Sequence, residues 1–244
     1  MIFYITVDLP KLEEINIRKC SEVVGKIVIA NLKSLKKIMT YTRYDEKEAL
    51  GTDVKSKYNS EGCCHSNKGR CCKDCSKCKK CGGNEKQCCK NCSDCTMCGK
   101  KLLCEYCSSH EVVIRNCETL EEIDLGDYSF YKFNSLSYDN LPCLRQLYIG
   151  SFCFRDIRQF CLHDQENLEY IEIGKESFVI SLNNGRRESG LFLISRCKKL
   201  KELKINNFSF FDYSTMELID LEALEIIHLG EGCFRYADLS LHSM

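Results

Sequence analysis

LEEIDLGDYSF at residues 120–130 is one copy of a motif that the chain repeats, and this repetition decides the fold. The motif reads Leu-x-x-Ile/Leu-x-Leu/Ile, then usually Gly, two more residues, Ser or Cys, and Phe. Further copies begin at Leu144, Leu168, Leu200 and Leu224. Their spacing is 24 residues, except for the 32 residues from Leu168 to Leu200. A fixed period of this size indicates stacked repeat units, so the sequence predicts a solenoid.

Each repeat also carries a second apolar pair, eight and six residues before its anchoring leucine. For Leu144 this pair is Leu136 and Tyr138. Apolar residues two apart indicate a short strand with one buried face. We therefore expect two short strands in every turn, and we expect the eight additional residues of the long interval to form a polar loop within 179–189.

The same motif fits the first forty residues, where Leu12 and Leu35 are the anchors. From Leu35 to Leu120 there are 85 residues, which is one 24-residue period plus 61 more. The predicted fold is thus a mainly β repeat solenoid of about seven turns of 23–24 residues, interrupted after the second turn by an irregular cysteine-rich insertion. The predicted divisions are turns 1–2 at 1–45, the insertion at 46–109 and turns 3–7 at 110–244.

The motif resembles that of the leucine-rich repeat superfamily, whose units of about 20–29 residues stack one strand per turn into a curved sheet. Its Ile-Gly-x-x-Ser-Phe ending is similar to the BspA-like repeats, which end in Ile-Gly-x-x-Ala-Phe. The chain departs from both, because the laddering Asn of such repeats is matched only by Asn206 and the Pro of BspA-like units is absent. The resemblance implies a binding scaffold with no catalytic residue to carry over.

The charge and the apolar content of the sequence bear on the partners and the location of the protein. With 35 basic and 35 acidic residues the formal net charge is zero, so no long-range attraction to nucleic acid or to an acidic membrane is expected. No apolar run reaches the roughly 18 residues of a membrane span, and the first eight residues lack the basic start of a signal peptide. We therefore expect a cytoplasmic protein, with a cell-surface or secreted location as the alternative.

Catalytic motifs are missing from the sequence. It contains no phosphate loop, nucleotide fingerprint or His-x-x-x-His metal helix. Cys161 and His163 are close in sequence but lack a third group to orient them, so they do not predict a nucleophile. We expect no enzyme.

One position of the motif, between its last two apolar residues, points to the outer face of the predicted sheet. From turn to turn this central row reads Asn16, Met39, Asp124, Tyr148, Glu172, Lys204 and His228. Because the charge changes sign along the row, it favours a protein partner of unknown identity, and a solvated face without a partner fits it too. The predicted partner-binding residues are Tyr148, Tyr170, Glu172, Lys204 and His228, with the tyrosines as aromatic anchors.

Cysteine is unusually frequent, with 21 residues, of which 14 lie within 63–107. The sequence Cys-Cys-x-x-Cys-x-x-Cys-x-x-Cys-Gly occurs twice in this block, at 71–82 and at 88–99. Up to Lys101 the only large apolar residue of the block is Met97, so burial of apolar surface cannot fold it. Sulfur chemistry must hold the block together if it is ordered.

Two sulfur chemistries fit the block. Chained Cys-x-x-Cys spacing lets thiolates grip and bridge tetrahedral ions. With ten Lys and Arg and four Asp and Glu, the block has a formal net charge of +6. If all fourteen cysteines were thiolates the net charge would be −8, and four divalent ions would return it to zero. In local composition the block resembles metallothioneins. The alternatives to metal binding are disulfide bonds between the cysteines or a reduced, disordered loop. The predicted ligands of zinc or another thiophilic metal are Cys63, Cys64, Cys71, Cys72, Cys75, Cys78, Cys81, Cys88, Cys89, Cys92, Cys95, Cys98, Cys104 and Cys107.

The sequence thus predicts a non-catalytic protein-binding scaffold with a metal-binding insertion. Metal storage or thiol redox buffering by the cysteine block is one alternative function, and a surface or secreted repeat protein with a disulfide-stapled insertion is another. Neither end of the array has a polar capping turn, so we expect either that the chain is a fragment of a longer array or that it self-associates through the uncapped ends.

Overall fold

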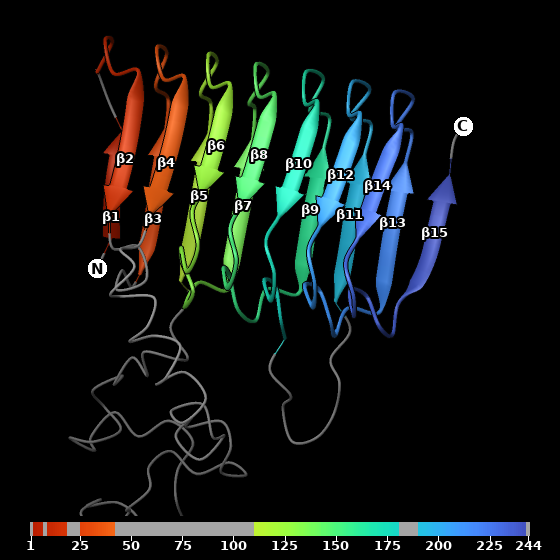
Figure 1. Cartoon of the computed structure of the whole chain (residues 1–244). Coiled ribbons are helices and arrows are strands. Elements are labelled where there is room, and N and C mark those ends of the chain that lie inside the picture. The colour runs from red at the N-terminus through yellow and green to blue at the C-terminus, as the bar shows by residue number, and fades with distance from the viewer. Residues whose placement is uncertain (1, 7–8, 19–24, 42–109, 181–189, 243–244) are drawn as a thin grey trace, which may run out of the picture. The chain divides into compact units, whose positions relative to one another are not determined.

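A computed structural model describes residues 2–6, 9–18, 25–41, 110–180 and 190–242, which form a parallel β-solenoid of two layers (Figure 1). The described residues contain fifteen strands and no helix. All of these strands belong to one compact unit, Met1–Lys47 with Ser109–Met244. The predicted cysteine-rich insertion and the predicted polar loop fall almost wholly outside the described residues.

The front layer in Figure 1 is a seven-stranded sheet in the order β14-β12-β10-β8-β6-β4-β2. Its strands are formed by the repeat motif, one from each of the seven predicted turns. They are β2 (Glu14–Arg18), β4 (Lys37–Tyr41), β6 (Glu122–Leu125), β8 (Gln146–Ile149), β10 (Tyr170–Ile173), β12 (Glu202–Ile205) and β14 (Ile226–Leu229). This confirms the predicted stack of seven turns.

The opposite layer holds the second strand of each turn, in two four-stranded sheets of order β1-β3-β5-β7 and β15-β13-β11-β9. These strands are β1 (Ile2–Thr6), β3 (Lys26–Ala30), β5 (Glu111–Arg115), β7 (Ser135–Asp139), β9 (Gln159–His163), β11 (Leu191–Ser195), β13 (Thr215–Ile219) and β15 (Asp238–His242). Two strands per turn is therefore also confirmed.

The sheet runs without a break past the cysteine-rich insertion. β4 pairs directly with β6, and Ile38 lies opposite Ile123 in the parallel register. On the other layer β3 pairs with β5 in the same way, with Ile27 opposite Val112. The turns before and after the insertion thus stack on each other as consecutive turns.

The core lies between the two layers and is formed by the apolar positions of the motif. The anchoring leucines Leu35, Leu120, Leu144, Leu168 and Leu200 are all fully buried. Burying such a side chain contributes about 1.5–3 kcal/mol, so every turn adds a similar increment to one continuous core.

The phenylalanine that ends the motif adopts an unusual backbone conformation in all five copies. Phe130, Phe154, Phe178, Phe210 and Phe234 have φ values between 49° and 57°, in the left-handed region. This conformation costs roughly 1–2 kcal/mol for a residue with a side chain. The rings form a buried column with successive centroids 4.7 to 5.7 Å apart. Burial of each ring, at about 1.5–3 kcal/mol, offsets that cost and holds the corner of the turn.

The Ser or Cys before each Phe ties one turn to the next. Ser177 Oγ donates to the carbonyl of Gly150 at 2.8 Å, and Ser209 Oγ donates to the carbonyl of Gly174 at 2.5 Å. In the same position Cys153 Sγ donates to the carbonyl of the preceding turn's glycine at 3.3 Å. Cysteine replaces serine here because it is also a small donor, although a weaker one.

An asparagine ladder runs along the corner that follows the strands of the second layer. Asn116 Nδ2 donates to Asn31 Oδ1 at 3.0 Å, and Asn140 Nδ2 donates to Asn116 Oδ1 at 3.1 Å. All three have φ between 50° and 59°, where Asn is favoured among residues with side chains. This ladder lies at a different corner from Asn206, which follows β12 of the seven-stranded sheet, and it was not predicted from the sequence.

The C-terminal end of the array is open. In β10, Ile171 and Ile173 are fully buried, whereas the equivalent Ile227 and Leu229 of β14 are 39% and 44% exposed. Leu239 of β15 is likewise exposed, because no further turn of the described residues covers this end. These are the side chains that the predicted self-association would cover.

Candidate functional site

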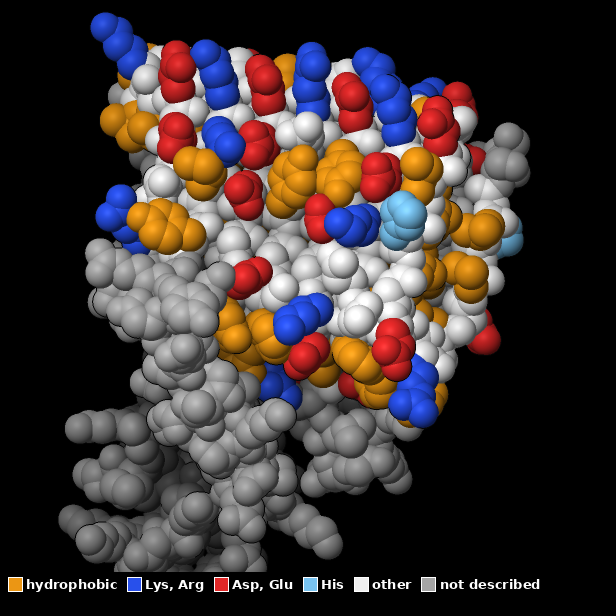
Figure 2. Space-filling model, viewed as in Figure 1, with side chains coloured by type: hydrophobic (Ala, Val, Ile, Leu, Met, Phe, Trp, Pro, Cys, Tyr) orange, Lys and Arg blue, Asp and Glu red, His pale blue; other side chains and the backbone are white. Residues whose placement is uncertain are grey.

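The predicted central row lies on the exposed face of the seven-stranded sheet, in the predicted order (Figure 2). The register pairs in the row are Asp124 with Tyr148, Tyr148 with Glu172, Glu172 with Lys204 and Lys204 with His228. Adjacent strands lie about 4.8 Å apart, so each side chain of the row can contact the next one. Tyr170 lies beside the row, with its ring centroid 5.3 Å from that of Tyr148.

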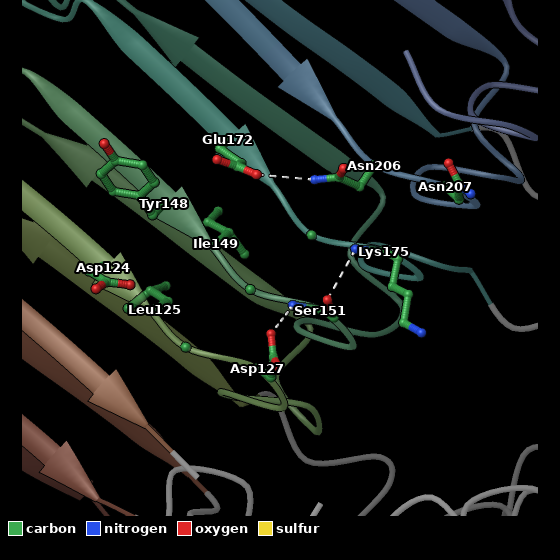
Figure 3. Close-up of a pocket in the computed structure, with 13 residues that line it drawn as sticks. Asp124, Leu125, Asp127, Tyr148, Ile149, Ser151, Glu172, Lys175, Asn206 and Asn207 are labelled. Atoms are coloured by element: carbon green, nitrogen blue, oxygen red, sulfur yellow. Dashed lines mark hydrogen bonds between the residues drawn. The ribbon is translucent and has the colours of Figure 1, made fainter. Parts of the chain in front are cut away.

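A groove of about 480 Å³ opens on this face, where β6, β8 and β10 end and the glycine turns begin (Figure 3). Asp124, Tyr148 and Glu172 form its side along three neighbouring strands, as Figure 3 shows. Asp127 and Lys175 lie at its other edge. The groove brings together two of the five predicted partner-binding residues, Tyr148 and Glu172, whereas Tyr170, Lys204 and His228 are not among its lining residues.

The glycines of the motif form the floor of this groove. A Cβ on Gly150 would lie 2.4 Å from the backbone nitrogen of Asp127, and one on Gly174 would lie 2.3 Å from that of Ser151. Neither position can hold a side chain, because the stacked turns approach too closely there. The backbone is left uncovered at this level of the sheet, and a hollow results.

Hydrogen bonds between turns fix the edge of the groove. The backbone nitrogen of Ser151 donates to Asp127 Oδ1 at 2.8 Å, and that of Lys175 donates to Ser151 Oγ at 3.3 Å (Figure 3). The Lys175 ammonium lies 5.4 Å from the centroid of the Phe152 ring. The same kind of hydrogen bond, from a backbone N–H to a side-chain oxygen of the preceding turn, thus occurs in successive turns and fixes the edge of the groove.

Glu172 is held by three donors. Its carboxylate accepts hydrogen bonds from Tyr170 Oη at 2.7 Å and from Asn206 Nδ2 at 3.3 Å, and it forms an ion pair with Lys204 Nζ at 2.7 Å. Burial acts to raise the pKa of Glu172, but the hydrogen bonds from Lys204 and Tyr170 outweigh it and leave the pKa below its usual range. Glu172 therefore stays ionised, and its charge is neutralised within the protein.

Asp124 differs from Glu172 in having no such donor. Lys37, whose positive charge acts on Asp124, pairs with Glu122 at 2.8 Å, and the half-buried Asp124 carboxylate accepts no hydrogen bond from the described residues. Burial, and then the neighbouring Glu122, raise the pKa of Asp124, while Lys37 lowers it in part. The groove thus contains one carboxylate that forms no ion pair and no hydrogen bond with the described residues.

Sequence reasoning missed two features of this site, although both have a signal in the sequence. The groove floor follows from the glycine that occupies the same position of the motif in successive turns. A charge row lies at the other edge of the sheet, where red and blue side chains alternate in Figure 2. It is formed by the residue after each anchoring leucine: Glu13, Lys36, Glu121, Arg145, Glu169, Lys201 and Glu225.

The fourteen predicted metal ligands lie outside the described residues. Within the described ranges no group of three His, Cys, Asp or Glu side chains is arranged to hold a metal ion. Six cysteines are placed there, and none of them forms a disulfide with another described residue: Cys117, Cys143, Cys153, Cys161, Cys197 and Cys233. Burial raises the pKa of Cys197 to about 11, so this thiol is protonated and unreactive at neutral pH.

Comparisons with known proteins add no relative: no family model, no curated protein and no solved structure matches the chain. The fold assignment therefore rests on the repeat itself, which forms the stacked parallel sheets of a β-solenoid. Among the described residues there is also no helix long and apolar enough to cross a membrane.

Proposed function

We propose that the protein is a non-catalytic leucine-rich-repeat scaffold, with repeats of the BspA-like kind, that binds another protein through its seven-stranded sheet. The groove beside Asp124, Tyr148 and Glu172 is the centre of the binding surface. The make-up of the groove is the main support for the proposal, because the groove combines an aromatic ring, a carboxylate without a partner and walls fixed by the stacked turns.

The surrounding face is suited to complete such an interface. Stable protein complexes bury about 800 Å² on each partner, much more than one groove provides. Aromatic residues near the centre of an interface commonly supply most of the binding free energy. Tyr148 and Tyr170 hold this central position, with Lys204 and His228 as the polar surroundings on the neighbouring strands.

The test is selection of binders from a random library of dodecapeptides displayed on phage, with the full chain as bait. Selected peptides should bind the wild type and lose at least about tenfold in affinity for Tyr148→Ala, as expected for an aromatic anchor. The matched control is Tyr236→Ala, which removes an exposed tyrosine outside the central row, in the segment between β14 and β15, and should leave binding unchanged. Peptides that bind both variants equally well would overturn the proposal.

We further propose that the cysteine block at 63–107 binds several divalent ions, zinc or another thiophilic metal, in a cytoplasmic, reducing setting. The support is its repeated Cys-x-x-Cys spacing and its charge balance, together with the absence of disulfides among the six described cysteines. Storage of metal by the block remains the alternative role for the same chemistry.

Native mass spectrometry of protein purified under reducing conditions tests this second proposal. The expected result is a set of mass increments for bound divalent ions, lost on acidification because the thiolates become protonated. A chain without metal whose mass deficit matches seven disulfides would overturn the metal-binding proposal and favour the disulfide-stapled, secreted alternative.

A further inference from the structure

The charges around the groove leave the carboxylate of Asp124 without an ion-pair partner among the described residues. Two ion pairs flank Asp124 on the sheet, Lys37 with Glu122 at 2.8 Å and Lys204 with Glu172 at 2.7 Å. Each pair joins opposite charges, and Asp127 and Lys175 at the other edge of the groove are also of opposite sign, so Asp124 leaves one negative charge over. A ligand that approaches this part of the groove therefore meets a net negative charge, which excludes an anionic group and favours a cationic one.

An aromatic ring stands directly beside that carboxylate. Tyr148 is the register partner of Asp124 on one side and of Glu172 on the other. Its ring packs against Tyr170 at 5.3 Å with an interplanar angle of 44°, which fixes it in place. Carboxylates on both sides add to the attraction of the ring face for a cation.

We propose that the groove takes an arginine side chain of the protein partner, with the guanidinium over the Tyr148 ring and its N–H groups donating to the Asp124 carboxylate. This inference rests on the proposed binding function and names the group that the groove recognises. Arginine fits better than lysine because its planar guanidinium stacks on a ring while its in-plane N–H groups donate to a carboxylate on the next strand, and neighbouring strands lie only about 4.8 Å apart. A lysine ammonium is a point charge and satisfies one of the two contacts at a time.

The experiment uses the peptides selected against the full chain. Selected sequences should share an arginine, and synthetic versions in which citrulline replaces it should bind about tenfold more weakly, because citrulline keeps the shape and loses the charge. Asp124→Asn should weaken the arginine peptide by a similar factor and leave the citrulline peptide unchanged. The coupling in this double-mutant cycle is the signature of direct contact.

A second carboxylate serves as the control. Asp139→Asn removes an exposed charge from β7 on the opposite layer and should change neither affinity. Peptides that need Tyr148 but bind equally well with arginine or citrulline would overturn the arginine inference and leave the binding scaffold standing. If no selected peptide depends on Tyr148, both proposals fail.

Discussion

Two tyrosines with buried hydroxyl groups show how one hydrogen bond changes the contribution of the same side chain. Tyr213 is fully buried and its Oη donates to the carbonyl of Ile157 at 2.7 Å. The Tyr138 hydroxyl is also buried but has no partner among the described residues. A buried polar group without a hydrogen bond costs about 1–3 kcal/mol, whereas a satisfied one contributes about 1 kcal/mol.

Removal of these two hydroxyls should therefore have opposite effects. We expect Tyr138→Phe to raise the free energy of unfolding by about 1 kcal/mol, because the unpaired hydroxyl disappears. Tyr213→Phe should lower it by about 1–2 kcal/mol, because the Ile157 carbonyl loses its donor. Urea denaturation of both variants measures the two changes, and a loss of stability in Tyr138→Phe would show that its hydroxyl is satisfied in solution.

Asp124 should lower the stability of the protein at neutral pH. Its pKa in the folded state lies above the usual 3.8, so the folded protein holds the proton more tightly than the unfolded chain. Above the folded pKa, ionisation of Asp124 opposes folding, and below pH 3.8 this cost disappears. Glu122, Lys37 and Tyr148 are the charged and titratable groups that face it.

The variant Asp124→Asn should thus be more stable than the wild type at pH 7, by less than about 1 kcal/mol because solvent screens a half-exposed group. The difference in melting temperature should shrink as the pH falls through the raised pKa towards 3.8. Thermal unfolding followed by circular dichroism between pH 3 and pH 7 provides the check. An advantage that stays constant over this range would contradict the electrostatic explanation.

At the scale of strands, the repeat motif predicted the elements because burial and hydrogen bonding repeat with the same period as the sequence. The anchoring leucines, the inward isoleucines and the column of phenylalanines all follow from it. The asparagine ladder was missed because its row continues with Asp164 and Arg196, which form an ion pair instead of an amide contact. These positions share one backbone conformation but not one residue type, so the sequence alone does not reveal that they form a row.

The groove could be predicted only in part for a different reason. The sequence placed Tyr148 and Glu172 on the outer face, and the parallel register confirms their order. The isolation of Asp124 depends on which carboxylates Lys37 and Lys204 select as partners. That choice is made by side-chain rotamers and distances across strands, which motif spacing does not determine.

The charge row should stabilise the stacking of the strands. Neighbouring turns carry opposite charges, and Lys36 with Glu13 and Lys201 with Glu169 form ion pairs at 3.1 and 3.7 Å. Arg145 stands between two glutamates of this row, so Arg145→Glu would create three acidic residues in succession.

We expect Arg145→Glu to lower the free energy of unfolding by about 0.5–1 kcal/mol in low salt, because like charges on paired strands repel. At 1 M salt, where the screening length is about 3 Å, most of this loss should disappear. Arg145→Gln removes the positive charge without adding a negative one and should lose less. Urea denaturation at both salt concentrations tests the series, and an equal loss in each would point to packing instead of charge.

At the scale of the whole molecule, the solenoid and the cysteine block have separate sources of stability. The solenoid buries one apolar core that continues from β4 to β6, and the strand pairs on both layers bypass the insertion. The block has almost no apolar side chains to contribute to that core. In a repeat array each turn is stabilised mainly by its neighbours, so the solenoid should not depend on the block.

Deletion of residues 46–106 tests this independence. The deletion leaves nine residues between Thr40 and Glu111, the same number that connects Leu125 to Ser135 in the next turn. The shortened chain should therefore close its turn without strain, unfold cooperatively and bind the selected peptides with unchanged affinity, while the bound metal is lost. Circular dichroism, peptide titration and native mass spectrometry follow these three properties. If the shortened chain failed to fold, the block would have to stabilise the solenoid, and if it kept its metal, the metal would be bound outside the deleted cysteines.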